Sequence, residues 1–162
     1  MSMSYRRTGC PINNTLETFG DRWSLIILRD SMFGGRPRSF RSYLTESIEG
    51  IASNILSDRL KRLTANGLLT RGRDPSHKQR VAYSLTEKAI ELVPLMAVMG
   101  SWGLRHTLPA PDLATGAQVL EDGGPQLWEE FMDELRHIHL GAPRPAVSAF
   151  ARMEAAYAAA AE

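Results

Sequence analysis

The chain has 162 residues, and its 19 lysines and arginines nearly balance its 18 aspartates and glutamates, so the formal net charge at pH 7 is +1. This length can bury an ordinary hydrophobic core, while a single cysteine excludes an intrachain disulfide framework and is typical of a cytoplasmic protein. The apolar runs are too short to cross a membrane, and the first ten residues lack the apolar segment of a secretory signal.

Two helices are predicted at the start of the chain. The first begins at Pro11, which suits a first helical turn, and ends at Gly20. Its apolar stripe is formed by Ile12, Leu16 and Phe19. Asp21 can cap a second helix that continues to Phe33 and is apolar on nearly every side. Such a helix is expected at the centre of the core.

Residues 36–67 predict two further short helices. The apolar positions of the first are Phe40, Leu44 and Ile48, at four-residue spacing. The second runs from Ser53 to Asn66, and Gly67 can adopt a positive φ just past its end. One face of this helix carries Leu56, Leu60 and Leu63. The opposite face is polar and carries Asn54, Ser57, Asp58 and Lys61. One face is therefore suited to packing and the other to recognition.

A hairpin follows these helices. The strand-like segments 68–71 and 81–85 flank a polar run from Arg73 to Arg80, which predicts a long, charged tip. Helix, turn, helix and hairpin in this order are typical of a winged helix-turn-helix. In that fold the second helix enters the major groove of DNA, and the hairpin, or wing, contacts the backbone or the minor groove.

The distribution of charge favours nucleic-acid binding more than the net charge does. Residues 36–80 carry 10 basic and 4 acidic side chains, whereas residues 108–162 carry 3 basic and 9 acidic ones. The positive surplus therefore falls on the segments that would face a duplex. The alternative is that these cations only keep a small domain in solution.

Several motifs in the same region carry a family resemblance. They are Cys10-Pro11, the segment 20–30 (GDRWSLIILRD), Arg38-Ser39-Phe40, the segment 50–68, the segment 82–86 (AYSLT), and a following helix that contains Trp102. In order and spacing the chain from Cys10 to Trp102 resembles the HxlR family of bacterial transcription regulators. The resemblance implies a homodimeric winged-helix protein of MarR-like shape that represses or activates nearby genes. Where the family usually has Ser before the recognition helix, this chain has Ala52, so Ser53 or a water is expected to cap that helix. Asn54 stands where the family often has Lys.

The helix after the wing is expected to serve dimerisation. Thr86 can cap it, it would end near His106, and Pro94 inside it should bend its axis. Its apolar stripe is formed by Leu92, Met96, Met99 and Trp102. Because one small domain cannot bury this stripe and that of the first helix, we expect the two to pair across a twofold axis. Such a homodimer would present two recognition helices about 34 Å apart to a palindromic operator in double-stranded DNA.

The fold class is therefore mainly α with a small β-hairpin wing, divided into a winged helix-turn-helix and dimerisation domain at residues 1–106 and a C-terminal helical extension at residues 107–162. Prolines and glycines in the extension predict short helices, of which 126–140 and 146–161 are amphipathic. Their apolar faces could add to the dimer interface, line an effector cavity, or cover the wing domain.

The predicted DNA-binding residues fall into two groups. Base edges are expected to be contacted by Ser53, Asn54, Ser57 and Asp58, where Asn54 suits adenine and Asp58 suits cytosine. Phosphates or the minor groove are expected to be contacted by Arg38, Arg41, Lys61, Arg62, Arg71, Arg73, His77, Lys78 and Arg80.

Cys10 is a candidate redox sensor. It lies at a helix start near Arg6 and Arg7, where the helix dipole and the cations would favour the thiolate. Regulators that resemble this chain carry a similarly placed cysteine that senses oxidants, quinones or aldehydes. The alternative is a small buried residue that packs the first helix.

Other chemistry has little support in the sequence. The four histidines lack the spacing of a metal site, and no motif indicates a cofactor or an enzyme active site. A cavity for a small hydrophobic ligand could be lined by Trp102, Trp128, Phe131 and Met132. The leading interpretation is a cytoplasmic transcription regulator that binds DNA. The alternative is a winged-helix module that binds protein instead.

Overall fold

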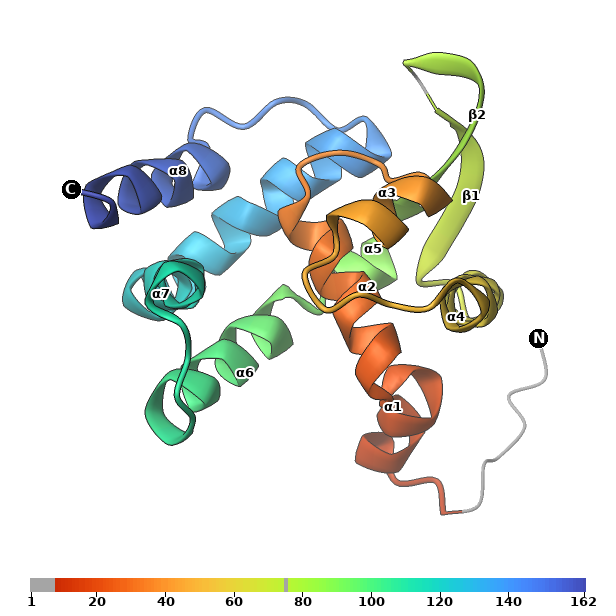
Figure 1. Cartoon of the computed structure of the whole chain (residues 1–162), viewed down its shortest axis with the longest axis horizontal. Helices are drawn as coiled ribbons and strands as arrows, with labels where there is room; N and C mark the ends of the chain where they lie inside the picture. The colour runs from red at the N-terminus through yellow and green to blue at the C-terminus, as the bar shows by residue number, and fades with distance from the viewer. Residues whose placement is uncertain (1–7, 75) are drawn as a thin grey trace.

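The computed structural model describes residues 8–74 and 76–162, which form eight helices and one antiparallel hairpin (Figure 1). The elements before the wing are α1 (Pro11–Phe19), α2 (Arg22–Phe33), α3 (Phe40–Glu46) and α4 (Ser53–Ala65). The wing consists of β1 (Leu69–Asp74) and β2 (His77–Leu85). After it come α5 (Glu87–Ile90), α6 (Val93–His106), α7 (Pro111–Leu140) and α8 (Ala149–Ala160). This order and composition confirm the predicted mainly α fold with a β-hairpin wing.

Helix α2 lies at the centre of the core, as predicted. Asp21 caps it by accepting a hydrogen bond from the Ser24 backbone N–H at 3.1 Å. The side chains of Ile27, Leu28 and Met32 are fully buried against the leucines of α4. The buried residues of α2 recur at intervals of three and four, which places them on one face, and Trp23 and Leu25 outside that face are partly buried against the core.

The predicted apolar stripe of α3 is wrong in part. Ile48 lies beyond the helix and is 65% exposed, whereas Tyr43 is the residue that enters the core. The Tyr43 hydroxyl is 2.7 Å from the Ser31 hydroxyl of α2, which supplies the polar partner that a buried phenol needs. Burial raises the pKa of Tyr43 to about 12, so the phenol stays protonated.

Recognition helix α4 packs as the sequence predicts. Its buried side chains are Leu56, Leu60 and Leu63. Gly67 ends the turn after the helix with a φ of +74°, a conformation that favours glycine. Of the two caps expected for α4, Ser53 or a water, the first is wrong, because the N-cap residue is Ala52 and Ser53 is already helical. No side chain of the described part of the chain replaces the missing cap.

The wing is more regular than the sequence suggests. Strands β1 and β2 pair from Leu69 opposite Leu85 up to Arg73 opposite Val81, and Asp74 then pairs with His77 across a bulge. Most of the predicted tip is therefore strand, and residue 75 lies outside the described residues. The Asp74 carboxylate accepts hydrogen bonds from the backbone N–H and hydroxyl of Ser76, which stabilises the turn.

The single bent helix predicted after the wing is wrong. Thr86 caps α5 as expected, but the chain leaves the helix at Glu91 and Leu92 and restarts as α6. Pro94 then occupies the first turn of α6, where its missing N–H costs no hydrogen bond. The proline therefore begins a helix instead of bending one.

The first helix of the C-terminal extension is longer than predicted, whereas the second, α8, is shorter than the predicted 146–161. Helix α7 continues through its glycines and prolines, with a kink at Gly124, whose φ of 59° and ψ of −159° are suited to glycine. Across this kink, the Trp128 indole N–H donates to the Leu120 carbonyl at 2.8 Å. The extension thus has one long kinked helix in place of several short ones, because α7 packs along its length against other elements of the chain.

The extension packs on its own chain. Helix α7 lies along α6 and reaches α5 and β2, and α8 folds back on α7 (Figure 1). Arg136 of α7 pairs with Glu87 of α5 at 2.8 Å, and His139 Nδ1 accepts the Leu85 backbone N–H of β2 at 3.2 Å. Phe131 is fully buried between Phe33 and Phe150. Of the three roles considered for the extension, these contacts favour a cover on the wing domain.

Helix α6 ends at His106, and the division of the chain into two domains after that residue stays a prediction. Buried side chains on both sides of it nevertheless belong to one hydrophobic core cluster. Within the part of the chain that is described, no helix combines the length and apolarity needed to span a membrane.

Candidate nucleic-acid interface

The outward face of α4 is polar and accessible. Ser53, Asn54 and Lys61 are exposed, and Ser57 is half-buried. Asp58 is exposed as well, but its carboxylate pairs with Arg59 of the next position. That pair reduces the capacity of Asp58 to accept a hydrogen bond from cytosine. The remaining side chains have the donors and acceptors that reading of base edges requires.

The wing presents a row of exposed cations beside α4. Arg71 and Arg73 lie two residues apart on β1, so their side chains point to the same face of the hairpin. On β2 the exposed residues include His77, Lys78 and Arg80. Helix α4 packs against β1, and Figure 1 shows both at the end of the molecule opposite α8. The polar helix face and the cationic hairpin therefore belong to one structural unit.

A hollow of about 610 Å³ lies between α3 and the tip of the wing. Its basic lining residues are Arg36, Arg41, His77 and Arg80. The carboxylates that also line it are those of Glu46 and Asp74, and both already accept hydrogen bonds from neighbouring side chains. The hollow is therefore positively charged and polar, which suits a phosphate group.

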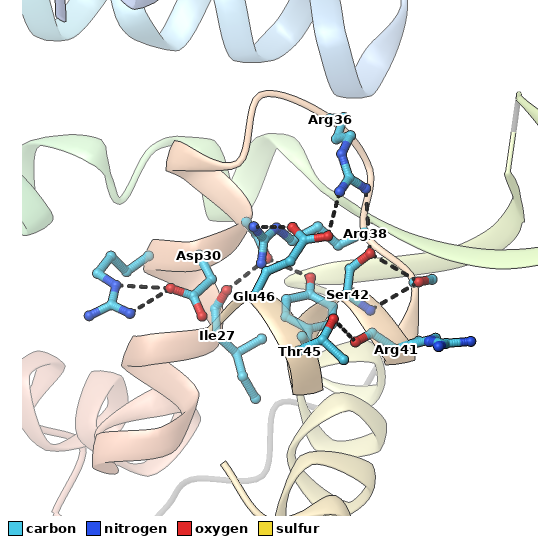
Figure 2. A network of polar contacts seen from close by, with 12 residues as sticks. Ile27, Asp30, Arg36, Arg38, Arg41, Ser42, Thr45 and Glu46 are labelled. Atoms are coloured by element: carbon cyan, nitrogen blue, oxygen red, sulfur yellow. Dashed lines mark hydrogen bonds and ion pairs between the residues drawn. The ribbon is translucent and has the colours of Figure 1, made fainter. Parts of the chain in front are cut away.

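Arg38 does not belong to this exposed surface. Its backbone pairs with that of Tyr83 in β2, and Arg38 is only 8% exposed. Figure 2 shows its guanidinium converging with that of Arg36 on Glu46, with contacts of 3.0 and 2.7 Å. Its guanidinium carbon also lies 5.7 Å from the centre of the Tyr43 ring. Burial and these contacts place Arg38 in the packing of α3 and leave its predicted phosphate contact without support.

Arg62 also departs from its predicted role. Its guanidinium turns toward α1 and donates to the Glu17 carbonyl at 2.6 Å. Sequence reasoning missed its neighbour Arg59, which binds Asp21 at 2.8 Å. Although burial acts to raise the pKa of Asp21, hydrogen bonds from Ser24 and Arg59 lower it to about 2. The spacing of the basic residues on α4 could have indicated this second polar face.

In the part of the chain that is described, no ion pair joins an acidic side chain of the extension to a cation of the wing. The ion pairs made there by Glu121, Glu129 and Asp133 run to Arg105 and Arg136. Glu134 accepts hydrogen bonds from Ser148 and Phe150 at the start of α8. Several carboxylates of the extension are thus held by cations within the helical bundle, away from the cations of the hairpin.

Two further apolar faces are open to solvent. On α1, Ile12 is 74% exposed and Leu16 is 56% exposed. On α6, Val98, Met99 and Trp102 are 53%, 45% and 58% exposed. Of the two stripes that the sequence assigns to dimerisation, only part is therefore open, because Phe19 is buried and Leu92 and Met96 pack against the core. A monomer gains no hydrophobic stabilisation from the exposed side chains.

Cys10 is exposed at the N-cap position of α1. It does not pack the first helix, so the alternative of a small buried residue is wrong. The cations invoked beside it, Arg6 and Arg7, lie outside the described residues.

The four side chains considered for a ligand cavity do not line a common space. Phe131 and Met132 belong to the core, whereas Trp102 lies at the surface with its ring centre 5.0 Å from that of His106. Trp128 is half-buried and holds the kink of α7. The structure therefore gives these residues packing roles.

The arrangement defines a class of protein. A helix-turn-helix with a polar recognition face, followed by a cationic wing, is the architecture of winged-helix regulators. Within that class, the chain belongs to the HxlR-like helix-turn-helix family, whose model matches residues 18–110, more than half of the chain.

Named relatives agree with this assignment. The chain is 36% identical over 110 residues to the uncharacterised HTH-type transcriptional regulator Mb3122 of Mycobacterium bovis, and the match covers 68% of this chain and 66% of the relative. Among solved structures it is similar to the reduced form of the regulator YodB from Bacillus subtilis, with a TM-score of 0.52, 31% identity, and coverage of 62% and 97% of the two chains. It is also similar to the redox regulator HypR in its reduced form, with a TM-score of 0.51, 28% identity, and coverage of 59% and 92%. The chain is a transcription regulator of the HxlR type.

Proposed function

We propose that the protein is a homodimeric regulator that binds a palindromic operator in double-stranded DNA. Each recognition helix α4 would enter a major groove, with Asn54 and its exposed neighbours at base edges, and each wing would contact the flanking backbone through Arg71, Arg73 and Arg80. The observation that carries this proposal is the exposed polar face of α4 beside uncovered cations of the wing. Arg41 and His77, at the hollow between α3 and the wing, would add phosphate contacts.

The proposed dimer interface combines α1 and α6. Burying exposed apolar surface contributes roughly 25 cal/mol for each Å² removed from water, so covering the open side chains would favour association. Because α1 and α6 are separate from α4 and the wing, such a dimer leaves both copies of α4 and both wings accessible. A palindromic site would then match the twofold symmetry of the protein.

An electrophoretic mobility shift with the DNA upstream of the encoding gene tests this function. Retarded DNA that survives a large excess of unrelated duplex is expected from a sequence-specific regulator. Retardation that the unrelated duplex abolishes would indicate only charge-driven binding. Failure to retard any duplex would contradict the proposal and favour a winged-helix module that binds protein.

Control by oxidants or electrophiles at Cys10 is the second part of the proposal. The thiol is exposed, as modification requires, and YodB and HypR are related regulators whose structures are described by their redox state. The thiol is a better switch than the suggested hydrophobic cavity, because the aromatic residues assigned to that cavity are divided between core and surface. Treatment with the thiol oxidant diamide should weaken DNA binding by the parent protein and spare Cys10→Ser. An equal loss in both proteins would refute control through this thiol.

A further inference from the structure

Helix α1 is joined to the recognition helix by side-chain hydrogen bonds. Phe19 is the one buried residue among its nine positions. The last carbonyls of a helix lack partners within it, and two of those in α1 accept from side chains of α4 and its C-cap residue. Arg62 Nη2 donates to the Glu17 carbonyl at 2.6 Å, and Asn66 Nδ2 donates to the Thr18 carbonyl at 3.1 Å. Arg62 also brings a positive charge to the negative end of the α1 dipole.

A third side chain of α4 reaches the junction between α1 and α2. Arg59 Nε donates to Asp21 Oδ1 at 2.8 Å, and Arg62 Nη1 lies 3.9 Å from Asp21 Oδ2. Asp21 is the same residue that caps α2. One end of each of α1 and α2 is therefore held by side chains of the recognition helix.

The three side chains occupy one face of α4. Positions 59, 62 and 66 are separated by three and four residues, which places them above one another along the helix. This anchoring face, made of Arg59, Arg62 and Asn66, lies between the buried leucine face and the outward face that carries Asn54 and Lys61. Helix α4 thus has one face for the core, one for DNA and one for α1.

We propose that Arg59, Arg62 and Asn66 are positioning residues, which make the orientation of α4 follow that of α1. This inference rests on the proposed function. The outer side of α1, with Ile12 and Leu16, forms part of the proposed dimer contact, and the anchoring face lies on the other helix of the pair. The hydrogen bonds therefore fix where each recognition helix stands relative to the twofold axis. They set the separation of the half-sites that the dimer accepts.

The test compares duplexes that differ in half-site spacing. The palindrome selected by the wild-type protein from random DNA is synthesised with its native spacing and with one base pair added or removed. Binding is measured by fluorescence anisotropy at several salt concentrations, and the folded fraction is measured by circular dichroism. The variants are Arg62→Met, the rescue variant Arg62→Lys, and the control Lys61→Met, which removes a cation from the exposed outward face of the same helix.

The preference of Arg62→Met for the native spacing over the altered spacings should be about tenfold lower than that of the wild type, because the variant loses a charge-assisted hydrogen bond. Its salt slope should equal that of the wild type. Arg62→Lys should retain the preference, since its ammonium can donate to the same carbonyl. Lys61→Met should keep the preference and reduce the salt slope by about one.

Two results would overturn the inference alone. If Arg62→Met behaves like Lys61→Met, Arg62 is a phosphate contact. If its binding to all spacings falls in proportion to the folded fraction, the anchoring face serves stability only. Absence of DNA binding by the wild-type protein would overturn the proposed function and this inference together.

Discussion

Acidification should destabilise the folded chain through one side chain of the extension, His139. Its Nδ1 accepts the Leu85 backbone N–H at 3.2 Å, so the neutral ring carries its proton on Nε2. Burial lowers the pKa of His139 from 6.5 to about 4. Protonation of Nδ1 would place two N–H donors against each other and charge a half-buried ring where α7 contacts β2.

The magnitude follows from the two pKa values. Between them the unfolded chain binds more protons than the folded chain, so acid favours unfolding. The contribution of His139 to the free energy of unfolding is complete above pH 6.5 and is lost as the pH falls toward about 4. At about pH 4.5 the loss should reach about 2.5 kcal/mol, a large part of the roughly 5 to 15 kcal/mol that stabilises an ordinary domain. Hydrogen bonding to Arg29 lowers the pKa of Glu49 from 4.5, so the contribution of Glu49 is lost only at more acidic pH.

Urea unfolding followed by circular dichroism, repeated at a series of pH values, measures this effect. His139→Asn should be less stable than the wild type at neutral pH and nearly insensitive to pH across the window. His106→Asn, at an exposed histidine of α6, is the matched control and should keep the wild-type dependence. If His139→Asn loses as much stability as the wild type between about pH 7 and about pH 4.5, the assignment to His139 is refuted.

Three further predictions test the core, the interface and the end of the recognition helix. Phe131→Ala should lower the free energy of unfolding by about 3 to 5 kcal/mol, because it empties a fully buried site, and an unchanged urea midpoint would contradict the packing of the extension into the core. Asn54→Ala should relax preference at one or two base pairs at a cost of about 1 to 3 kcal/mol, whereas Arg73→Ala should weaken binding to all sequences and reduce the salt slope by about one. Anisotropy titrations distinguish these two, and identical behaviour would contradict the proposed orientation of α4. Gly67→Ala should cost about 1 kcal/mol in thermal or urea unfolding because φ is +74° there, and a neutral result would contradict that conformation.

The sequence predicted best those features that depend only on residues close together in the chain. The leucine spacing of α4, the cap at Asp21 and the positive φ at Gly67 all follow from local rules, and the structure has each of them. The sequence did not predict the burial of Tyr43, because that burial depends on a partner hydroxyl from another helix, at Ser31. A search for apolar periodicity favours Ile48 instead, although the chain has already left the helix there.

The basic residues show why charge alone could not define the interface. Arg38, Arg62 and Arg73 have the same side chain, yet Arg38 is buried with Glu46 and Arg62 donates to a carbonyl of α1. Those partners are distant in the sequence and come together only when the helices pack. The helices of the extension were harder still to predict. The glycines and prolines of α7 predict breaks, whereas packing against α6 and β2 stabilises one kinked helix.

The stoichiometry of the DNA complex tests the central claim most directly. Light scattering coupled to size-exclusion chromatography should show that the free protein is a dimer and that one dimer binds each operator duplex. Anisotropy titrations of the same complex should show affinity falling steeply with salt, because several wing cations would contact phosphates. A monomeric protein, or a complex with one chain per duplex, would contradict the account of two symmetric recognition helices on a palindrome.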